Sequence, residues 1–376
     1  MKLTYCTECL YNNLKPDLFF NEQGVCSACT AFKQREKVDW IAREKEFKEL
    51  CDRLLSDKYQ YHCVVPVSGG KDSHYQVIKA KEYGLNPLAV CAVTDDLSTI
   101  GRHNLNNISS LGVDTIEFNL NSRLRRTINR YTLEEIGDIS WAEHVSIFTI
   151  PVRAALLYQI PLIIWGENPQ NEYGGPYRAQ QATKLDNRWL QEYGGLNGLR
   201  VSDLISQKIG TEKELAMYGY PKLELKTTSG VFLGQFFPWD GAQNAIIASQ
   251  HGFKTWYGPV EGIGYDYENL DNYQTGIHDY FKFLKYGFGR STDLVSNHIR
   301  RQNITRSEGV EMVVENDGKW PRTYLGKPLE EILDRIGVTL DQFIEICNKF
   351  ANKELFEVRK NKIPRALFKD SLRAQA

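Results

Sequence analysis

The sequence lacks three features that would each indicate a particular class of protein. It has no excess of charge, because 46 lysines and arginines stand against 47 aspartates and glutamates, so bulk charge does not favour binding to nucleic acid or anionic membranes. It has no long apolar run, because its most apolar stretch, residues 148–165, is interrupted by two prolines, an arginine and a glutamine. Its first residues do not resemble a secretory signal. We therefore expect a cytoplasmic protein with no membrane span and no nucleic-acid partner.

The part of the chain from residue 59 to 200 alternates apolar strands with helical patterns. The alternation predicts an α/β fold with a parallel sheet covered by helices on both faces, and such sheets bind ligands at the carboxyl ends of their strands. The predicted strands are 62–67, 88–93, 115–118 and 162–165, and the predicted helices are 72–83, 99–111, 122–136 and 141–158.

Two further regions flank this predicted domain. Residues 1–58 hold four paired cysteines and a linking helix at about 39–56. Residues 201–376 show a weaker pattern that is mostly helical and rich in aromatic residues. We therefore predict three units, 1–58, 59–200 and 201–376, of which the last binds substrate or partners.

A glycine-containing loop joins the first predicted strand to the helix after it. Two glycines let the backbone turn sharply, and the amides at the start of a helix bind phosphate groups. Lys71 adds a positive charge, and Asp72 either caps the helix or binds Mg²⁺. The spacing is not that of the Walker loop, GxxxxGK[ST]. The predicted ATP-binding residues here are Ser68, Gly69, Gly70, Lys71, Asp72 and Ser73, of which the last three are also the catalytic candidates.

Polar residues also follow the second and fourth predicted strands. Thr94 and Asp95 end the second strand and are predicted to bind ATP, or else to cap the next helix. Gly166 and Glu167 end the fourth strand, where a glycine permits close approach and a carboxylate binds a ribose or Mg²⁺, and a plain turn is the alternative.

The four paired cysteines form two CxxC units, Cys6 with Cys9 and Cys26 with Cys29. In a cytoplasmic protein such pairs indicate a metal site rather than disulfides. Four thiolates make a closed tetrahedral zinc site, which is structural because no position is open for catalysis. An iron–sulfur cluster is the alternative.

The loop 68–73 matches the SGGxDS signature of the N-type ATP pyrophosphatases, which implies the adenine nucleotide alpha hydrolase-like (PP-loop) fold. The whole layout further resembles the N-acetyl sugar amidotransferase family of bacterial surface-polysaccharide and flagellar-sugar biosynthesis. This second resemblance is carried by the following segments: residues 5–9, 22–29, 39–40, 65–73, 84–88, 163–167 and 285–290.

The resemblance implies an ATP-dependent reaction that turns the acetamido group of a nucleotide sugar into an acetamidino group. AMP placed on the amide oxygen makes that oxygen a leaving group, and ammonia then replaces it. No glutaminase motif is present, because Lys2 follows the initiator methionine and no cysteine lies in a glycine-rich elbow. The family implies that ammonia comes from separate glutaminase and cyclase-like subunits. Many relatives carry a further cysteine pair where this chain has Ser140 to His144.

The residues for the sugar are the hardest to predict. Arg290, His298 and Arg300 suit an anionic diphosphate or hexuronate, with a solvated helix face as the alternative. Asn168 and Glu172 follow the fourth strand and are further candidates.

Two other functions compete with the sugar amidotransferase. A tRNA thiolase also combines such a loop with cysteine clusters, but it needs a basic surface and usually a catalytic cysteine near the loop. Cys63 and Cys91 lie inside predicted strands, and the net charge is −1. A non-catalytic nucleotide-binding scaffold is the third possibility.

Overall fold

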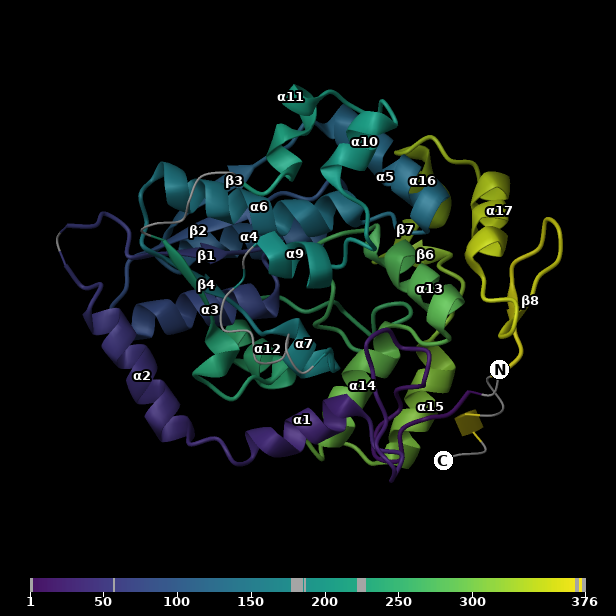
Figure 1. The fold of residues 1–376 in the computed structure, drawn as a ribbon, viewed down its shortest axis with the longest axis horizontal. Coiled ribbons are helices and arrows are strands. Elements are labelled where there is room, and N and C mark those ends of the chain that lie inside the picture. Colours follow the sequence, from purple (N-terminus) through teal and green to yellow (C-terminus); the bar gives the residue numbers. More distant parts are fainter. Residues whose placement is uncertain are drawn as a thin grey trace.

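The computed structural model describes residues 3–56, 58–176, 185, 187–221, 228–368 and 372–373. Its centre is a five-stranded sheet in the order β3-β2-β1-β4-β5 (Figure 1), in which every neighbouring pair is parallel. The predicted α/β fold is therefore confirmed. The strands are β1 (Cys63–Pro66), β2 (Pro87–Ala92), β3 (Asp114–Phe118), β4 (Leu162–Trp165) and β5 (Ser229–Phe232).

The fifth strand is the part of the sheet that the sequence patterns miss. β5 pairs with β4, although it lies beyond residue 200, at which we expect the sheet domain to end. Its sequence, Ser-Gly-Val-Phe, has only two residues with strand preference. The three predicted units stay a prediction, and the sheet draws on the third of them.

Helices cover both faces of the sheet because successive strand residues point to opposite sides. On one face Val64 and Leu88 pack in a core with residues of α6 and α9. On the other face Val65 and Ala89 pack with residues of α2, α3 and α4. These helices are α2 (Trp40–Asp52), α3 (Lys71–Glu82), α4 (Thr99–Ser110), α6 (Trp141–Leu157) and α9 (Asn187–Tyr193).

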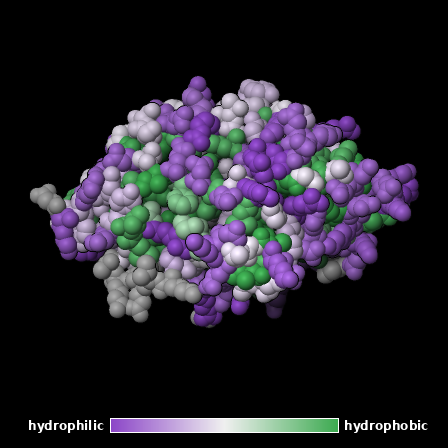
Figure 2. Space-filling model, turned by 90° about the horizontal axis from the view of Figure 1, so that it is seen from above, coloured by the Kyte–Doolittle hydropathy of each residue, from purple (hydrophilic) through white to green (hydrophobic). Residues whose placement is uncertain are grey.

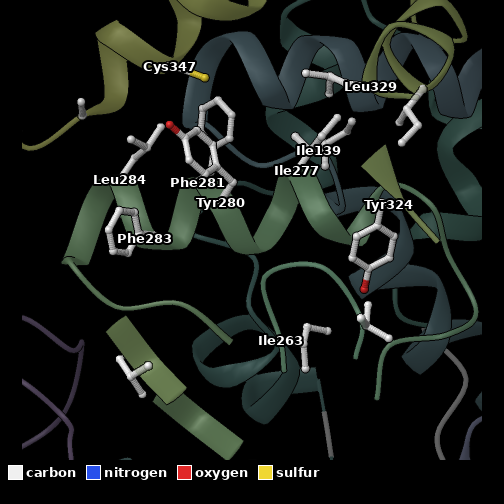
Figure 3. Close-up of a cluster of buried hydrophobic side chains, with 14 of the residues drawn as sticks. Ile139, Ile263, Ile277, Tyr280, Phe281, Phe283, Leu284, Tyr324, Leu329 and Cys347 are labelled. Carbon is white, nitrogen blue, oxygen red and sulfur yellow. The ribbon is translucent and has the colours of Figure 1, made fainter. Parts of the chain in front are cut away.

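The C-terminal region is mostly helical, as predicted, and has its own hydrophobic core. In Figure 3 the side chains of α13 (Thr275–Tyr286) lie along this core, with Cys347 of α17 (Leu340–Phe350) on one side. A capping box formed by Thr339 and Gln342 begins α17. Further elements are α14 (Arg290–Arg300), α15 (Arg306–Asn316), β6 (Thr323–Tyr324), β7 (Lys327–Pro328), α16 (Leu329–Asp334), β8 (Phe356–Glu357) and β9 (Arg365–Ala366).

The remaining helices lie between the strands of the sheet or between the sheet and this region. They are α5 (Ser122–Ile136), α7 (Pro169–Tyr173), α10 (Val201–Ser206), α11 (Glu212–Leu215), the 3₁₀ helices Ala216–Tyr218 and Leu233–Gln235, and α12 (Gly241–Gln250). Among the described residues, every helix is too short or too polar to cross a membrane. The face in Figure 2 is mostly hydrophilic, with apolar residues in separate areas between polar ones.

The cysteine module packs against the C-terminal helices. The Phe32 ring of its helix α1 (Ser27–Arg35) lies 5.6 Å from the guanidinium of Arg301 at the end of α14 (Figure 1). The Tyr11 hydroxyl donates to Asp293 Oδ1 at 2.9 Å, and the Tyr11 ring meets Phe288 edge-on at 5.9 Å. The first and last parts of the chain therefore form one side of the molecule.

Candidate functional site

The loop 68–73 joins the carboxyl end of β1 to the start of α3, as predicted. Gly69 has φ +86, and a Cβ there would lie 2.7 Å from the backbone nitrogen of Leu105. No other residue fits this position without moving the backbone of α4. Gly70 is the N-cap of α3 and makes no side-chain cap, so Asp72 does not cap the helix.

The two serines of the loop fix its shape and keep their hydroxyl protons. The amide of Ser68 donates to Ser73 Oγ at 2.9 Å, and the amide of Gly70 donates to Ser68 Oγ at 3.3 Å. Each hydroxyl accepts in these bonds, so its own proton remains available for a phosphate oxygen. The unpaired amides at the start of α3 point the same way. The loop has the donors that a pyrophosphate needs.

A cavity opens beside the loop, between the ends of β1 and β4. In the sheet, β2 and β3 lie on one side of β1, and β4 and β5 lie on the other side. The order of the strands therefore reverses between β1 and β4, and sheets of this kind bind ligands at such a point. The cavity encloses about 910 Å³, counting the part open to solvent. Four predicted ATP residues line it, namely Ser68, Ser73, Gly166 and Glu167, and its apolar lining is Pro66, Val67, Val90, Ala92, Ile147, Phe148, Pro151, Trp165, Pro169 and Phe232. Such a lining suits an adenine ring.

Lys71 and Asp72 face an adjoining cavity on the other side of the loop, which Glu167 also lines. The Lys71 ammonium is 2.8 Å from Asp72 Oδ2 and 2.6 Å from Glu268 Oε2. Burial alone would lower the pKa of Lys71, but these two carboxylates raise it well above its usual value. Lys71 is therefore charged, and its charge is balanced by side chains of the loop and of the C-terminal region.

Glu167 and Asp72 form a candidate magnesium site. Burial and the charge of Asp72 raise the pKa of Glu167 to about 7, and Asp72 Oδ1 accepts from Asn244 at 2.8 Å. Two carboxylates that repel one another beside a phosphate-binding loop suit Mg²⁺, which is held by one or two carboxylates and by phosphate oxygens.

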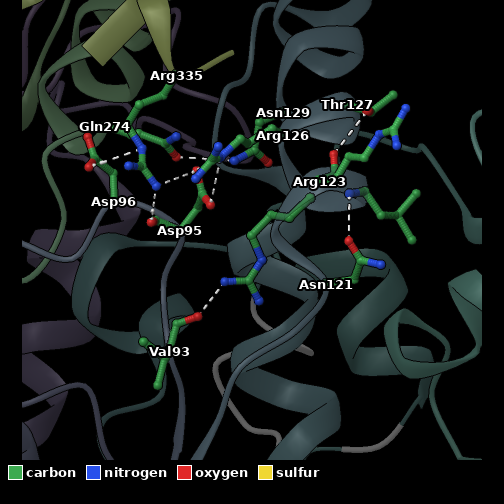
Figure 4. Close-up of polar contacts among 12 residues, drawn as sticks. Val93, Asp95, Asp96, Asn121, Arg123, Arg126, Thr127, Asn129, Gln274 and Arg335 are labelled. Atoms are coloured by element: carbon green, nitrogen blue, oxygen red, sulfur yellow. Dashed lines mark hydrogen bonds and ion pairs between the residues drawn. The ribbon is translucent and has the colours of Figure 1, made fainter. Parts of the chain in front are cut away.

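Thr94 and Asp95 lie away from the cavity that Ser68 lines. Asp95 is buried and faces two arginines (Figure 4), with Arg126 at 3.4 Å and Arg335 at 3.2 Å. The cap of α4 is Ser98, so these residues do not cap that helix either. Thr94 Oγ1 is buried and has no hydrogen-bond partner among the described residues. Their predicted ATP contact stays a prediction that this geometry does not favour.

The four paired cysteines come together as predicted. All four are buried, and their sulfur atoms lie within 4.8 Å of one another. Cys6 Sγ is 3.9 Å from Cys29 Sγ, and Cys9 Sγ is 3.6 Å from Cys26 Sγ. Zinc–sulfur bonds of about 2.3 Å give a tetrahedron with edges of about 3.8 Å. The cluster can therefore bind a metal such as zinc.

Two of the predicted substrate residues, Glu172 and His298, line the cavity of Lys71, whereas Arg290 lines a different one. Asn168 is the N-cap of α7, and Glu172 is held by Arg35 and Arg301. Arg300 donates to the Glu172 carbonyl at 3.0 Å and lies 5.5 Å from the ring centre of Tyr11 in the cysteine module.

His298 and Arg290 lie on α14, whose residues 291–296 are buried, so this helix is not a solvated face. His298 lines the cavity of Lys71 and meets the Tyr267 hydroxyl at 2.8 Å. Arg290 pairs with Glu268 and lines a different cavity.

The sequence patterns miss Glu268 and Arg301. Glu268 contacts both Lys71 and Arg290, and Arg301 contacts Glu172 and Asp240. Neither residue belongs to a motif. Arg301 follows a candidate arginine directly, which is the one local signal that points to it.

Residues 261–369 match the family model described as LPS biosynthesis protein WbpG-like, C-terminal domain. The match points to lipopolysaccharide biosynthesis. It supports an enzyme of sugar metabolism, and it covers Glu268, Arg290, His298 and Arg300 but neither the loop 68–73 nor the cysteine cluster. No curated protein matches the chain.

Proposed function

We propose that this protein is an ATP-dependent, AMP-forming amidotransferase of lipopolysaccharide biosynthesis. It activates the acetamido oxygen of a nucleotide-linked N-acetyl sugar as an adenylate and replaces that oxygen with ammonia, which gives an acetamidino sugar. The observation that carries the proposal is the loop Ser68–Ser73 at the carboxyl end of β1, beside a cavity with an apolar lining. The WbpG-like match supports the sugar substrate.

The residues of the loop would stabilise the pyrophosphate as it leaves. The amides at the start of α3 and the hydroxyls of Ser68 and Ser73 donate to phosphate oxygens. Lys71 supplies a fixed positive charge in a site where its ammonium is buried, and such a charge is most effective where water is excluded. Asp72 and Glu167 would hold Mg²⁺, which neutralises charge on the phosphates when bound. Adenine would occupy the apolar cavity between β1 and β4.

The remaining parts of the proposal concern the metal and the partners. Zinc in the four-cysteine cluster would be structural, because the cluster offers four thiolates and is closed. Ammonia would come from separate glutaminase and cyclase-like subunits. A cytoplasmic location follows from the need for ATP and for reduced thiols, and all eight cysteines are free.

The tRNA-thiolase alternative needs a reactive thiol, and the geometry does not favour one. Cys63 and Cys91 are buried in strands next to the loop. Burial raises the pKa of Cys91 to about 12 and raises that of Cys63 further, whereas a reactive thiol needs a lowered pKa. A scaffold without activity would not need the buried charge of Lys71 at the phosphate site.

The test is AMP formation from ATP, ammonium and a panel of acetamido nucleotide sugars. We expect Lys71→Ala, and Lys71→Met which keeps the apolar stem, to abolish AMP release, while Lys353→Ala at an exposed position does not change it. Mass spectrometry of the sugar would show oxygen exchanged for NH. Wild-type AMP formation by both Lys71 variants, or ADP as the product, would exclude the proposed role of the loop.

A further inference from the structure

A further large cavity lies where the cysteine module, the start of α6 and the helices α13 and α14 meet. It encloses about 1030 Å³, counting the part open to solvent. Its charged lining comes from all of these parts, and the proposed function uses only Arg290 among them. The titratable residues that line it are Lys15, Asp17, Asp138, His144, His278, Lys282, Lys285, Tyr173, Tyr286, Arg290 and Asp293.

Asp138 and His278 form a fixed pair in the wall of this cavity. His278 Nδ1 is 3.1 Å from Asp138 Oδ1, and Asp138 also accepts from the Ser140 amide at 2.8 Å and from Asn197 Nδ2 at 3.1 Å. A carboxylate can only accept, so Nδ1 of His278 carries a proton and Nε2 of the neutral ring keeps its lone pair. The side chain of His278 is 29% exposed, whereas that of Asp138 is 3% exposed. Asp138 is buried behind a histidine that faces the cavity.

This cavity shares a lining residue with the cavity that Lys71 lines. Tyr173 at the end of α7 lines both this cavity and the one that Lys71 lines. Arg290 lines it as well, and Arg290 pairs with Glu268, which in turn pairs with Lys71. A sugar that contacts Arg290 here would therefore be linked to Lys71, the proposed ligand of the ATP phosphates, through two ion pairs that share Glu268.

We propose that this cavity receives the acetamido nucleotide sugar and that His278 is the base for the attack of ammonia. The proposal rests on the proposed function and deepens it. In the first step the acetamido oxygen bonds to the α-phosphorus of ATP, the bond from that phosphorus to pyrophosphate breaks, and the amide nitrogen releases its proton to water. In the second step the nitrogen of ammonia bonds to the imidate carbon and the carbon–oxygen bond to AMP breaks, with its electron pair staying on AMP. His278 Nε2 takes one proton from the added nitrogen.

The surroundings of His278 suit both roles. Lys15, Lys282, Lys285 and Arg290 line the cavity beside Asp17, Asp138 and Asp293, and Lys282 and Arg290 are ion-paired with Asp293 and Glu268. The lining therefore has one more basic than acidic side chain, which suits an anionic diphosphate. The groups that face His278 are Asp138, Asp279, Lys282 and His144, whose ring centre is 4.9 Å away. Burial lowers the pKa of His278 and Asp138 raises it, and the net shift is upward. The raised pKa makes the neutral imidazole a stronger base for proton transfer.

The experiment separates the two steps with UDP-N-acetylglucosamine and other acetamido nucleotide sugars as probes. Without ammonium, exchange of labelled pyrophosphate into ATP reports adenylation. With ammonium, mass spectrometry reports the amidine. We expect His278→Gln to keep the exchange rate within about 3-fold of the wild type and to lower amidine formation about 100-fold or more. His103→Gln, at an exposed position of α4, is the matched control and should change neither rate.

The dependence of the amidine rate on pH gives a second test of the role of His278. A histidine with a purely structural role would not change this dependence. With free ammonia held constant, the wild-type amidine rate rises with pH as His278 loses its proton. Asp138→Asn removes the charge that raises the pKa of His278, so the rise should move to lower pH, whether or not His278→Gln folds well. An unchanged profile in Asp138→Asn, or wild-type amidine formation by folded His278→Gln, overturns this proposal alone. No sugar-dependent exchange in the wild type overturns the proposed function as well.

Discussion

Replacement of Glu268 by glutamine tests how the C-terminal region supports the loop. Glu268 is 5% exposed and contacts the ammonium of Lys71 and the guanidinium of Arg290. Burial raises the pKa of Glu268, but the two cations lower it by a larger amount, so the pKa falls from 4.5 to about 2. A pKa lowered from 4.5 to about 2 corresponds to about 3 kcal/mol of folding free energy at neutral pH. Glu268→Gln should therefore lower the free energy of unfolding by about 3 kcal/mol at pH 7.

The pH dependence makes this prediction specific. The folded-state pKa of Glu268 lies below its unfolded value, so its contribution is fully present above about pH 4.5 and is lost as pH falls toward about 2. The difference between wild type and Glu268→Gln should shrink to about 1 kcal/mol at about pH 3. Urea unfolding followed by circular dichroism at the two pH values measures it. Glu345→Gln, at an exposed position of α17, is the control and should cost less than about 0.5 kcal/mol.

Two results would refute this reasoning. One is a loss below about 1 kcal/mol at neutral pH, which would mean that Asp72 replaces Glu268 as the partner of Lys71 without cost. The other is an equal loss at both pH values, which would mean that the variant disturbs packing rather than a charge.

Three further predictions concern the cluster, the loop and the arginines around β2. Cys6→Ser should lose the stoichiometric zinc that metal analysis of the wild type should show, and iron in the wild type would favour the cluster alternative. Gly69→Ala should weaken ATP binding in calorimetry at least 10-fold and destabilise the protein by more than about 1 kcal/mol, because its Cβ would lie 2.7 Å from the Leu105 nitrogen; unchanged binding would contradict the geometry of the loop. Asp95→Asn should lower the free energy of unfolding in urea by about 1–2 kcal/mol, because Arg335 is 28% exposed and solvent weakens its ion pair with Asp95. The affinity for ATP should stay within about 3-fold of the wild type. A larger loss of affinity would support the predicted contact between Asp95 and ATP.

Local patterns were sufficient to predict most of the sheet and the loop. The strands β1, β2 and β4 are short apolar runs between turn residues, whereas β3 mixes polar and apolar residues. Gly69 and Gly70 follow shortly after the end of β1 at Pro66. The two CxxC pairs were equally easy to recognise in the sequence, because each pair lies within four residues. Only the contact between the two pairs is long-range. Features of this kind are set by neighbours in sequence.

The rest of the candidate site depends on contacts between distant parts of the chain. Glu268 reaches Lys71 across almost 200 positions, and no spacing rule predicts such a partner. The Asp138–His278 pair likewise joins a turn before α6 to α13. The surroundings of Asp95 are a further example, because the arginine that contacts it most closely, Arg335, lies near the other end of the chain. A charged residue at a strand end predicts a ligand only when no such partner balances its charge.

The two halves of the site therefore depend on each other. The loop supplies phosphate donors, but the carboxylate that balances its lysine, Glu268, comes from the region that matches the WbpG-like model. The same region supplies His278 and Arg290 to the second cavity, while Asp138 comes from the turn between α5 and α6. Glu268 forms direct ion pairs with both Lys71 and Arg290. A charged group of a bound sugar near Glu268 or Arg290 would therefore change the electrostatic interaction between Glu268 and Lys71. Sugar binding and ATP binding should accordingly be coupled, and the coupling should weaken in Glu268→Gln.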